Sequence, residues 1–172
     1  VAGLMGCFQY ESGFESNNLE NTYQSKFGYG TSKSGDERYT ADVNSGAESE
    51  QAFVSGRNNP EKVGYGIAQF TSSGLKQGLY NATVKNGKSI DDLQTQLEFV
   101  VQCLKDRGIY DMINNASTPT EANKYFLWKY EAGTGYNSDE AVLSAYNWIN
   151  KETDGYANGV LARHGAAEGF YK

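Results

Sequence analysis

The chain has 172 residues, a formal net charge of −6 at neutral pH and 38 % hydrophobic residues. This length suits one domain with a substantial core, and no apolar run is long enough to suggest a membrane span. Because no block of lysine and arginine stands out, the composition argues against a nucleic-acid binder. No signal peptide is visible. We expect a single domain over residues 1–172, as one module of a longer protein.

Residues 1–12 carry apolar side chains at spacings of three and four, which is typical of one buried helix face. These side chains are Val1, Leu4, Met5 and Phe8. Glu11 continues that face, and Gly13 is expected to end the helix. Glu11 is therefore either a half-exposed capping residue or an acid with a raised pKa. The second follows if apolar surroundings and the negative end of the helix dipole disfavour its charged form.

Residues 15–62 are polar and rich in glycine, serine and asparagine, and the segment is too long for a plain loop in a compact domain. We expect a small hairpin or short helices that form one wall of a cleft. The stretch DERYTADVNSG predicts a short helix or turn pair that ends at Gly46. In VGYGIAQF, residues 63–70, two glycines flank Tyr65 and small residues precede Gln69. Such a stretch either lets the backbone approach a ligand closely or is a simple turn.

Residues 89–107 form the clearest predicted helix, with Ser89 as N-cap and Gly108 at its end. Its apolar stripe predicts a central core helix and consists of Leu93, Leu97, Val100, Val101 and Leu104. In TPTE, Thr118 is expected to cap another helix, with Pro119 first and Glu121 closing a capping box.

That helix should stop at Gly133 and Gly135. Further helices are expected after Ser138 and within residues 156–171. The pattern predicts a mainly α fold of the α+β type, a helical bundle with one irregular or β-containing insert.

The two cysteines, Cys7 and Cys103, lie in apolar helical patterns, so they are either two buried thiols or one disulfide. A thiol peptidase would need one of them to meet His164, the single histidine. Helix-interior cysteines seldom do that. We expect no metal and no cofactor.

Three short segments, ES after helix one, YGIAQF and YEAGTG, resemble in this order the three motifs of the lysozyme superfamily, particularly goose-type lysozymes and soluble lytic transglycosylases. A closer likeness is to the phage tail lysozyme family. VAGLMGCFQYESGFESNNLEN resembles that family's first motif, and YGIAQFTSSGLKQGLY, DLQTQLEFVV and ARHGAAEGFYK resemble later ones. The likeness covers nearly all of the chain.

The resemblance implies a lysozyme-like fold and a peptidoglycan glycosidase that cuts between N-acetylmuramic acid and N-acetylglucosamine. The expected location is a virion tail, the cell exterior or the cell wall. The expected partners are wall glycan strands and other phage tail or wall-entry modules.

The first motif makes Glu11 the candidate general acid, because cleavage needs a protonated carboxyl near neutral pH. Ser12 and Gln69 would orient that acid or the substrate, and Tyr65 and Tyr130 would line the sugar groove. Glu131 stands where related transglycosylases have asparagine. It is either a structural acid or a groove residue.

A second carboxylate would come from the insert, where the candidates are Asp36, Glu37, Asp42, Glu48 and Glu50. If none reaches the site, a single-glutamate lytic transglycosylase is the alternative to a hydrolase. We favour it because Asn44 occupies the place of the expected partner. The alternative from another class is a non-catalytic glycan-binding or structural module of a phage tail tip, which would not need an acid at this helix end.

Overall fold

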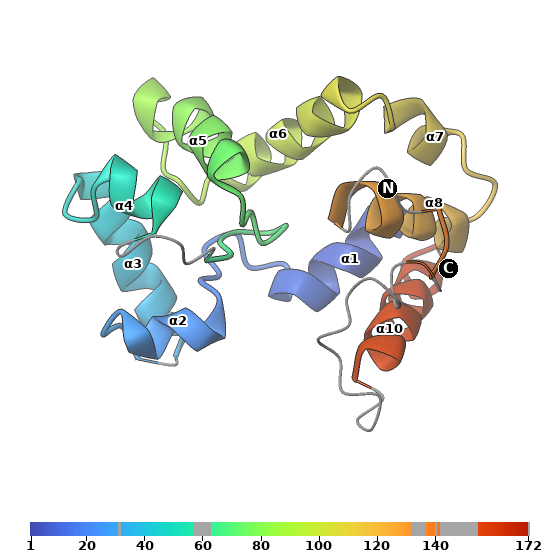
Figure 1. Cartoon of the computed structure of the whole chain (residues 1–172), viewed down its shortest axis with the longest axis horizontal. Helices are drawn as coiled ribbons and strands as arrows, with labels where there is room; N and C mark the ends of the chain where they lie inside the picture. Colours follow the sequence, from blue (N-terminus) through green and yellow to red (C-terminus); the bar gives the residue numbers. More distant parts are fainter. Residues whose placement is uncertain (31, 57–62, 132–136, 140, 142–154, 172) are drawn as a thin grey trace. The chain divides into compact units, whose positions relative to one another are not determined.

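The computed structural model describes residues 1–30, 32–56, 63–131, 137–139, 141 and 155–171 (Figure 1). The chain divides into two compact units. Unit 1 comprises Val1–Glu11 with Val101–Lys172, and unit 2 comprises Ser12–Val100. The prediction of a single domain over residues 1–172 stays a prediction. The fold is mainly helical, as predicted. In the described part of the chain, extended pairing is limited to two isolated bridges, Leu19–Tyr65 and Tyr65–Phe70.

The expected insert is helical. Its described helices are α2 (Asn21–Lys26), α3 (Lys33–Ser45) and α4 (Glu50–Ser55). Helix α3 is the helix predicted in DERYTADVNSG, and Gly46 ends it with a left-handed φ of 80°. Unit 2 continues with α5 (Ser73–Ala82) and the 3-10 turn Val84–Asn86. The expectation that the insert forms a cleft wall facing Glu11 stays a prediction.

A buried carboxylate organises the start of unit 2. The Oδ1 of Asp36 on α3 accepts hydrogen bonds from the backbone N of Leu19, at 2.9 Å, and from the side chain of Gln24 on α2. All three residues are buried. Because a buried polar group costs free energy unless it is paired, Asp36 fixes where α2 and the preceding chain lie against α3.

Helix α6 (Leu93–Asp106) differs from the predicted helix in its start and in its buried face. The prediction of Ser89 as N-cap is wrong, because the backbone N of Thr95 donates to Asp92 Oδ1, at 2.9 Å. Leu93 and Leu97, predicted to lie in the core, are 45 % and 37 % exposed, whereas Gln96 is fully buried. The buried face is rotated because Gln96 finds backbone partners in the interior, so it is buried at little cost.

Unit 1 is built from α1 (Ala2–Ser12, of which Ser12 belongs to unit 2), α7 (Tyr110–Asn114), α8 (Pro119–Phe126) and α10 (Gly155–Gly169), with the end of α6. Two glycines let α1 approach its neighbours. A Cβ at Gly3 would lie 2.6 Å from the Cβ of Ala122 on α8, and one at Gly6 would lie 2.8 Å from the backbone N of Ala167 on α10. Val1, expected on the buried face, is exposed, because the contact face is formed by the glycines and Cys7 instead.

The predicted capping box before α8 is confirmed. Thr118 Oγ1 accepts from the backbone N of Glu121 at 3.1 Å, and Glu121 Oε2 accepts from the backbone N of Ser117 at 2.7 Å. Helix α8 then continues as a π-helical turn, Leu127–Glu131. The predicted stop at Gly133 and Gly135 lies outside the described residues, as does most of the helix expected after Ser138. The last predicted helix is α10.

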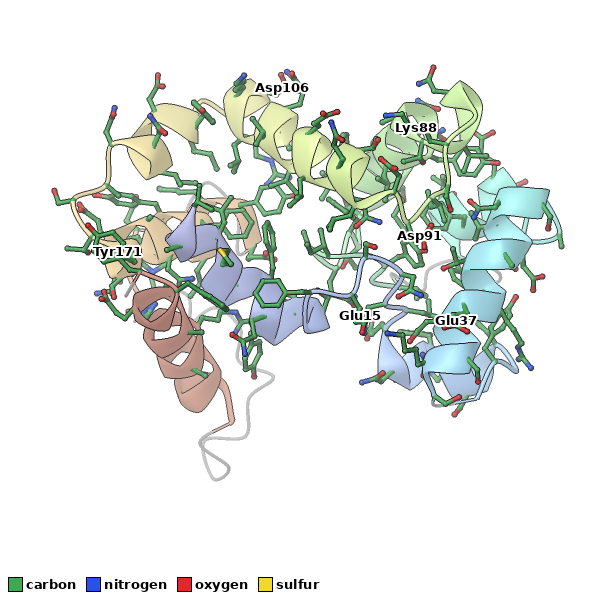
Figure 2. All side chains as sticks on the ribbon, turned by 180° about the vertical axis from the view of Figure 1, so that it is seen from behind. Glu15, Glu37, Lys88, Asp91, Asp106 and Tyr171 are labelled. Atoms are coloured by element: carbon green, nitrogen blue, oxygen red, sulfur yellow. The ribbon has the colours of Figure 1, made fainter. Side chains whose placement is uncertain are left out.

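Charged side chains such as Glu37 and Asp106 point away from their helices (Figure 2). Cys7 and Cys103 are buried free thiols, which decides between the two alternatives left open for them. None of the helices described here is both long and apolar enough to cross a membrane.

Gly6→Ala tests the close approach of α1 to α10. We expect it to lower the free energy of unfolding by about 1–3 kcal/mol, because the added methyl group meets backbone atoms that cannot move aside independently. Gly165→Ala on α10 is the matched control, since a Cβ there has open space around it. That change should be neutral or stabilise by up to about 1 kcal/mol. Urea unfolding of both variants gives the comparison, and equal effects would contradict the tight contact.

Candidate active site

The segment with two glycines, residues 64–70, forms a tight turn in unit 2 that we call the glycine turn. Gly66 has a φ of 81° and Gln69 a φ of 44°. A Cβ at Gly64 would lie 2.5 Å from Gln69 Oε1, and one at Gly66 would lie 2.7 Å from Gln96 Oε1. The glycines therefore make room for two glutamine side chains of the protein itself, in addition to allowing the left-handed backbone at Gly66.

Three polar side chains hold the glycine turn: Ser12, Gln69 and Gln96. Ser12, the last residue of α1, donates from Oγ to the carbonyl oxygen of Ile67 at 2.9 Å. Gln69 Nε2 donates to Asn18 Oδ1 at 2.8 Å and to the Asn18 carbonyl at 3.1 Å. The turn is thus fastened to the chain that immediately follows Glu11. Ser12 and Gln69, predicted as site residues, thus both hold this turn through hydrogen bonds to backbone atoms. Their part in orienting the acid or the substrate stays a prediction.

Gln96 is a site-forming residue that the sequence analysis missed. Its Oε1 accepts from the backbone N of Ile67 at 2.9 Å. Its Nε2 donates to the carbonyls of Ser16, at 2.7 Å, and Ile90, at 3.0 Å. The available signal was that Gln96 lies four residues before Val100 and eight before Leu104, in line with the apolar stripe of this helix.

Tyr65 belongs to the glycine turn, and its side chain packs into the core of unit 2. It is 1 % exposed, and its hydroxyl lies 2.6 Å from Thr40 Oγ1. Its ring contacts those of Tyr39 and Phe53, with centroid distances of 5.7 and 5.6 Å. In unit 2 it is a core residue, and its part in sugar binding stays a prediction.

Glu11 lies in unit 1 in a group that we call the carboxyl cluster, which consists of Glu11, Glu131, Arg107 and Arg163. Glu11 Oε1 accepts a hydrogen bond from Nη2 of Arg163 on α10, which forms an ion pair. The Arg163 side chain is 6 % exposed, whereas the Glu11 side chain keeps 20 % exposure. The Arg163 guanidinium also lies 3.8 Å from the ring centre of Tyr10. A buried, ring-stacked cation thus orients a carboxylate that solvent still reaches.

Tyr130 and Glu131 occupy the π-helical turn after α8. The Tyr130 ring stacks on Phe126 with centroids 4.7 Å apart, and Arg107 Nη1 donates to the Tyr130 carbonyl at 3.0 Å. Tyr130 is 6 % exposed, and its role in a sugar groove stays a prediction. Burial raises the pKa of the Glu131 carboxyl well above its usual range, and the nearby charge of Glu11 raises it further.

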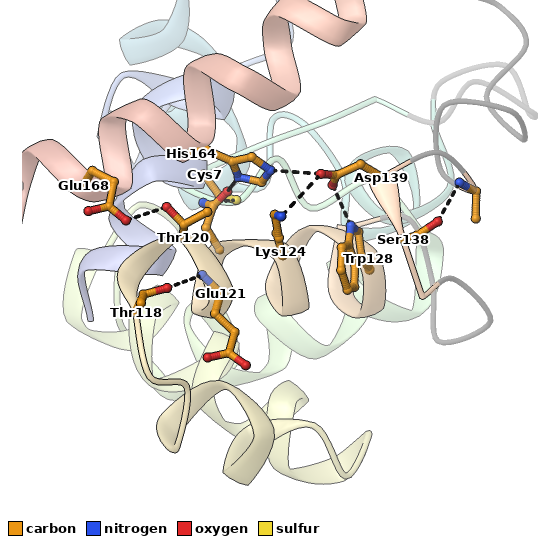
Figure 3. Close-up of polar contacts among 12 residues, drawn as sticks. Cys7, Thr118, Thr120, Glu121, Lys124, Trp128, Ser138, Asp139, His164 and Glu168 are labelled. Carbon is orange, nitrogen blue, oxygen red and sulfur yellow. Dashed lines mark hydrogen bonds and ion pairs between the residues drawn. The ribbon is translucent and has the colours of Figure 1, made fainter.

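Cys7 and His164 are linked through an asparagine rather than in direct contact (Figure 3). Asn123 Nδ2 donates to Cys7 Sγ at 3.1 Å, and Asn123 Oδ1 lies 2.7 Å from His164 Nδ1. Asp139 lies 3.3 Å from His164 Nε2 and accepts from Trp128. Burial, together with the charge of Glu131, raises the pKa of the Cys7 thiol well above its ordinary value. A neutral thiol whose hydrogen-bond partner is an asparagine, not a base, argues against a thiol peptidase.

Three of the five acidic candidates of the insert have partners inside unit 2, Glu37 is exposed and Glu48 is buried. Asp36 holds Leu19 and Gln24, Asp42 accepts from the Tyr29 hydroxyl at 2.7 Å, and Glu50 pairs with Lys85 at 2.6 Å. Among the described residues, histidine, cysteine, aspartate and glutamate side chains do not gather in threes that could hold a metal ion.

The family model described as phage tail lysozyme matches residues 1–151, which include Glu11, the glycine turn and Glu131. The chain belongs to the phage tail lysozyme family. The resemblance seen in the sequence is thereby confirmed, and membership implies a peptidoglycan-lytic, lysozyme-like function. Neither the curated proteins nor the solved structures include a match to this chain.

Gln96→Leu tests how the glycine turn is held in this family member. The leucine keeps most of the volume but leaves a backbone N–H and two carbonyls without their partner, each at a cost of about 1–3 kcal/mol if no water replaces it. We expect a marked loss of stability together with faster amide exchange at Ile67. Gln94→Leu on the exposed side of the same helix is the control and should change little. Thermal unfolding and hydrogen exchange report both effects.

Proposed function

We propose that the protein is a peptidoglycan glycosidase that cleaves the β-1,4 bond between N-acetylmuramic acid and N-acetylglucosamine, with Glu11 as its general acid. The observation that carries this proposal is the placement of Glu11 within a chain of this family. Glu11 stands at the end of a helix, is fixed by the buried Arg163, and still keeps solvent access. A group that must meet a polymer needs both orientation and access.

In the proposed reaction, the protonated Glu11 carboxyl donates its proton to the glycosidic oxygen as the bond from that oxygen to the sugar C1 breaks. A water molecule or a hydroxyl group of the same sugar then attacks C1. The Glu11 carboxylate takes the proton of whichever group attacks. Water yields a reducing end, and the internal hydroxyl yields an anhydro end.

The single-glutamate route receives support from the insert. Asp36, Asp42 and Glu50 already serve hydrogen bonds or ion pairs within unit 2, so their presence is explained without catalysis. We therefore favour the transglycosylase products. In that case alanine at Glu37, an exposed position, should leave lysis unchanged, whereas alanine at Asp36 acts through stability.

We further infer that the protein acts on wall glycan strands from a virion tail or the cell exterior, next to other tail or wall-entry modules. The family supports this location. The net charge of −6 gives no general attraction to an anionic wall, so binding should depend on contacts with the sugars.

Glu11→Gln tests the acid. The glutamine keeps the size and the acceptor oxygen for Arg163 but has no proton to transfer. We expect lysis of purified cell walls to fall at least about tenfold, because general acid catalysis typically contributes ~10²–10⁴-fold. Thermal stability should also fall, because the neutral amide no longer compensates the buried charge of Arg163, so lysis is compared at a temperature at which the variant is folded.

Glu15→Gln is the matched control. Glu15 is exposed and pairs with Lys33 at 2.8 Å, an interaction of small energetic weight. Mass spectrometry of the digest separates reducing from anhydro ends. Glu11→Gln with more than about a tenth of the activity would contradict the acid assignment. A wild-type protein that binds wall glycan but releases no fragments would favour the non-catalytic module.

A further inference from the structure

One oxygen of the half-buried Glu131 side chain is enclosed in a way that its structural surroundings do not explain. This atom, Oε1, is shielded from solvent, and no donor among the described residues reaches it. A buried carboxyl oxygen without a hydrogen bond costs free energy, and an apolar side chain of similar size would fill the space without that cost. The residue belongs to the π-helical turn Leu127–Glu131, and such turns are frequent at functional sites.

The turn is held firmly, so the position of Glu131 is well defined within unit 1. Tyr130, the preceding residue, stacks on Phe126, and Phe126 meets Phe8 of α1 edge-on with centroids 5.8 Å apart. Arg107 fixes the same turn through the Tyr130 carbonyl. These contacts tie Glu131 to the helix that carries Glu11.

Charged and titratable groups face Glu131 from each neighbouring element. Glu11 and Cys7 come from α1, Arg163 from α10, Arg107 from the chain after α6, and Tyr130 from its own turn. Arg163 already donates to Glu11, and its Nε and Nη1 are buried without a partner among the described residues. Two carboxyls thus interact with each other beside one buried guanidinium that is bonded to only one of them.

We propose that Glu131 is a positioning residue that acts through Glu11, and that the two carboxyls hold one proton between them while Arg163 neutralises the ionised member. This inference rests on the proposed function of Glu11. Ionised Glu11 bonds to Arg163, and the proton then resides on Glu131. When the proton resides on Glu11, the charge of Arg163 balances ionised Glu131. Like charges that interact oppose the loss of the last proton, as in other carboxyl pairs.

The proposal answers a chemical need of the site. A general acid must be protonated, whereas an ion pair with arginine is made by a carboxylate. Glu131 supplies the opposing negative charge that lets Glu11 hold a proton despite Arg163. The buried position of Glu131 strengthens this effect, because charges interact more strongly away from water.

Glu131→Gln tests this proposal through the pH dependence of kcat/KM on purified cell walls, because the direction of the expected shift is defined. The variant has lost the second carboxyl, so nothing opposes ionisation of Glu11 next to Arg163. We expect the basic limb of the profile to move at least about one unit to lower pH, while activity persists on the acidic side. Glu131→Asp retains a titratable group and should keep the limb closer to that of the wild type.

Glu168→Gln is the matched control, because Glu168 is an exposed carboxylate on α10 of the same unit. It removes the same formal charge and should leave the profile in place. A structural role for Glu131 would lower stability or activity at all pH values alike and would not shift the limb. Superimposable profiles of wild type and Glu131→Gln would overturn the inference.

A second readout does not need activity. Carbon-13 labelled glutamate carboxyls can be titrated by NMR in the wild type and in Glu11→Gln. The charge of Glu11 raises the pKa of Glu131, so the Glu131 transition should move to lower pH in Glu11→Gln. An unmoved Glu131 transition defeats the inference while leaving the glycosidase proposal intact. A shifted transition in a protein that releases no glycan fragments defeats the proposed function alone.

Discussion

Unit 1 depends on one buried guanidinium. Arg163 has two nitrogens without partners in the described residues, so most of the cost of burying its charge is offset by the single contact to Glu11 and by the Tyr10 ring. That contact requires α10 to lie close to α1, and Gly6 makes the close approach sterically possible. The end of α1 and α10 are thereby constrained together, and the orientation of Glu11 follows from that constraint.

The backbone of unit 2 is held in place by a different kind of interaction. The Asp36 carboxylate holds the start of the unit, and neutral polar side chains do most of the rest: Ser12, Gln69 and Gln96 each end on main-chain atoms of the glycine turn or of the chain next to it. Amide and hydroxyl groups can be buried at modest cost once they are paired. A turn fixed in this way keeps its geometry without a strand pair.

The sequence predicted what depends on local pattern. The helix ending at Gly13, the capping box at Thr118 and the end of α3 at Gly46 follow from caps and glycines, and the structure has them. Burial was less predictable. Leu93 and Leu97 are exposed and Gln96 is buried instead. Periodicity reports only the spacing of apolar side chains, so it does not predict that buried backbone groups pair with Gln96.

The site was predictable only in part. Glu11, Ser12 and Gln69 were proposed from their motifs, and their roles stay predictions. Arg163 was not assigned a role, since its contact with Glu11 joins residues at opposite ends of the chain and no spacing rule connects them. Glu131 was left between a structural acid and a groove residue, because burial of one oxygen atom is a property of packing.

The two free thiols have a practical consequence. The fold does not depend on a disulfide, so its stability should be the same in reducing and oxidising surroundings. Cys7 is fully buried about one turn before Glu11 on α1, with Asn123 against its sulfur. A thiol reagent can reach it only when the surrounding helices separate. The rate of its modification therefore measures how often this part of the protein opens, with no probe added to the chain.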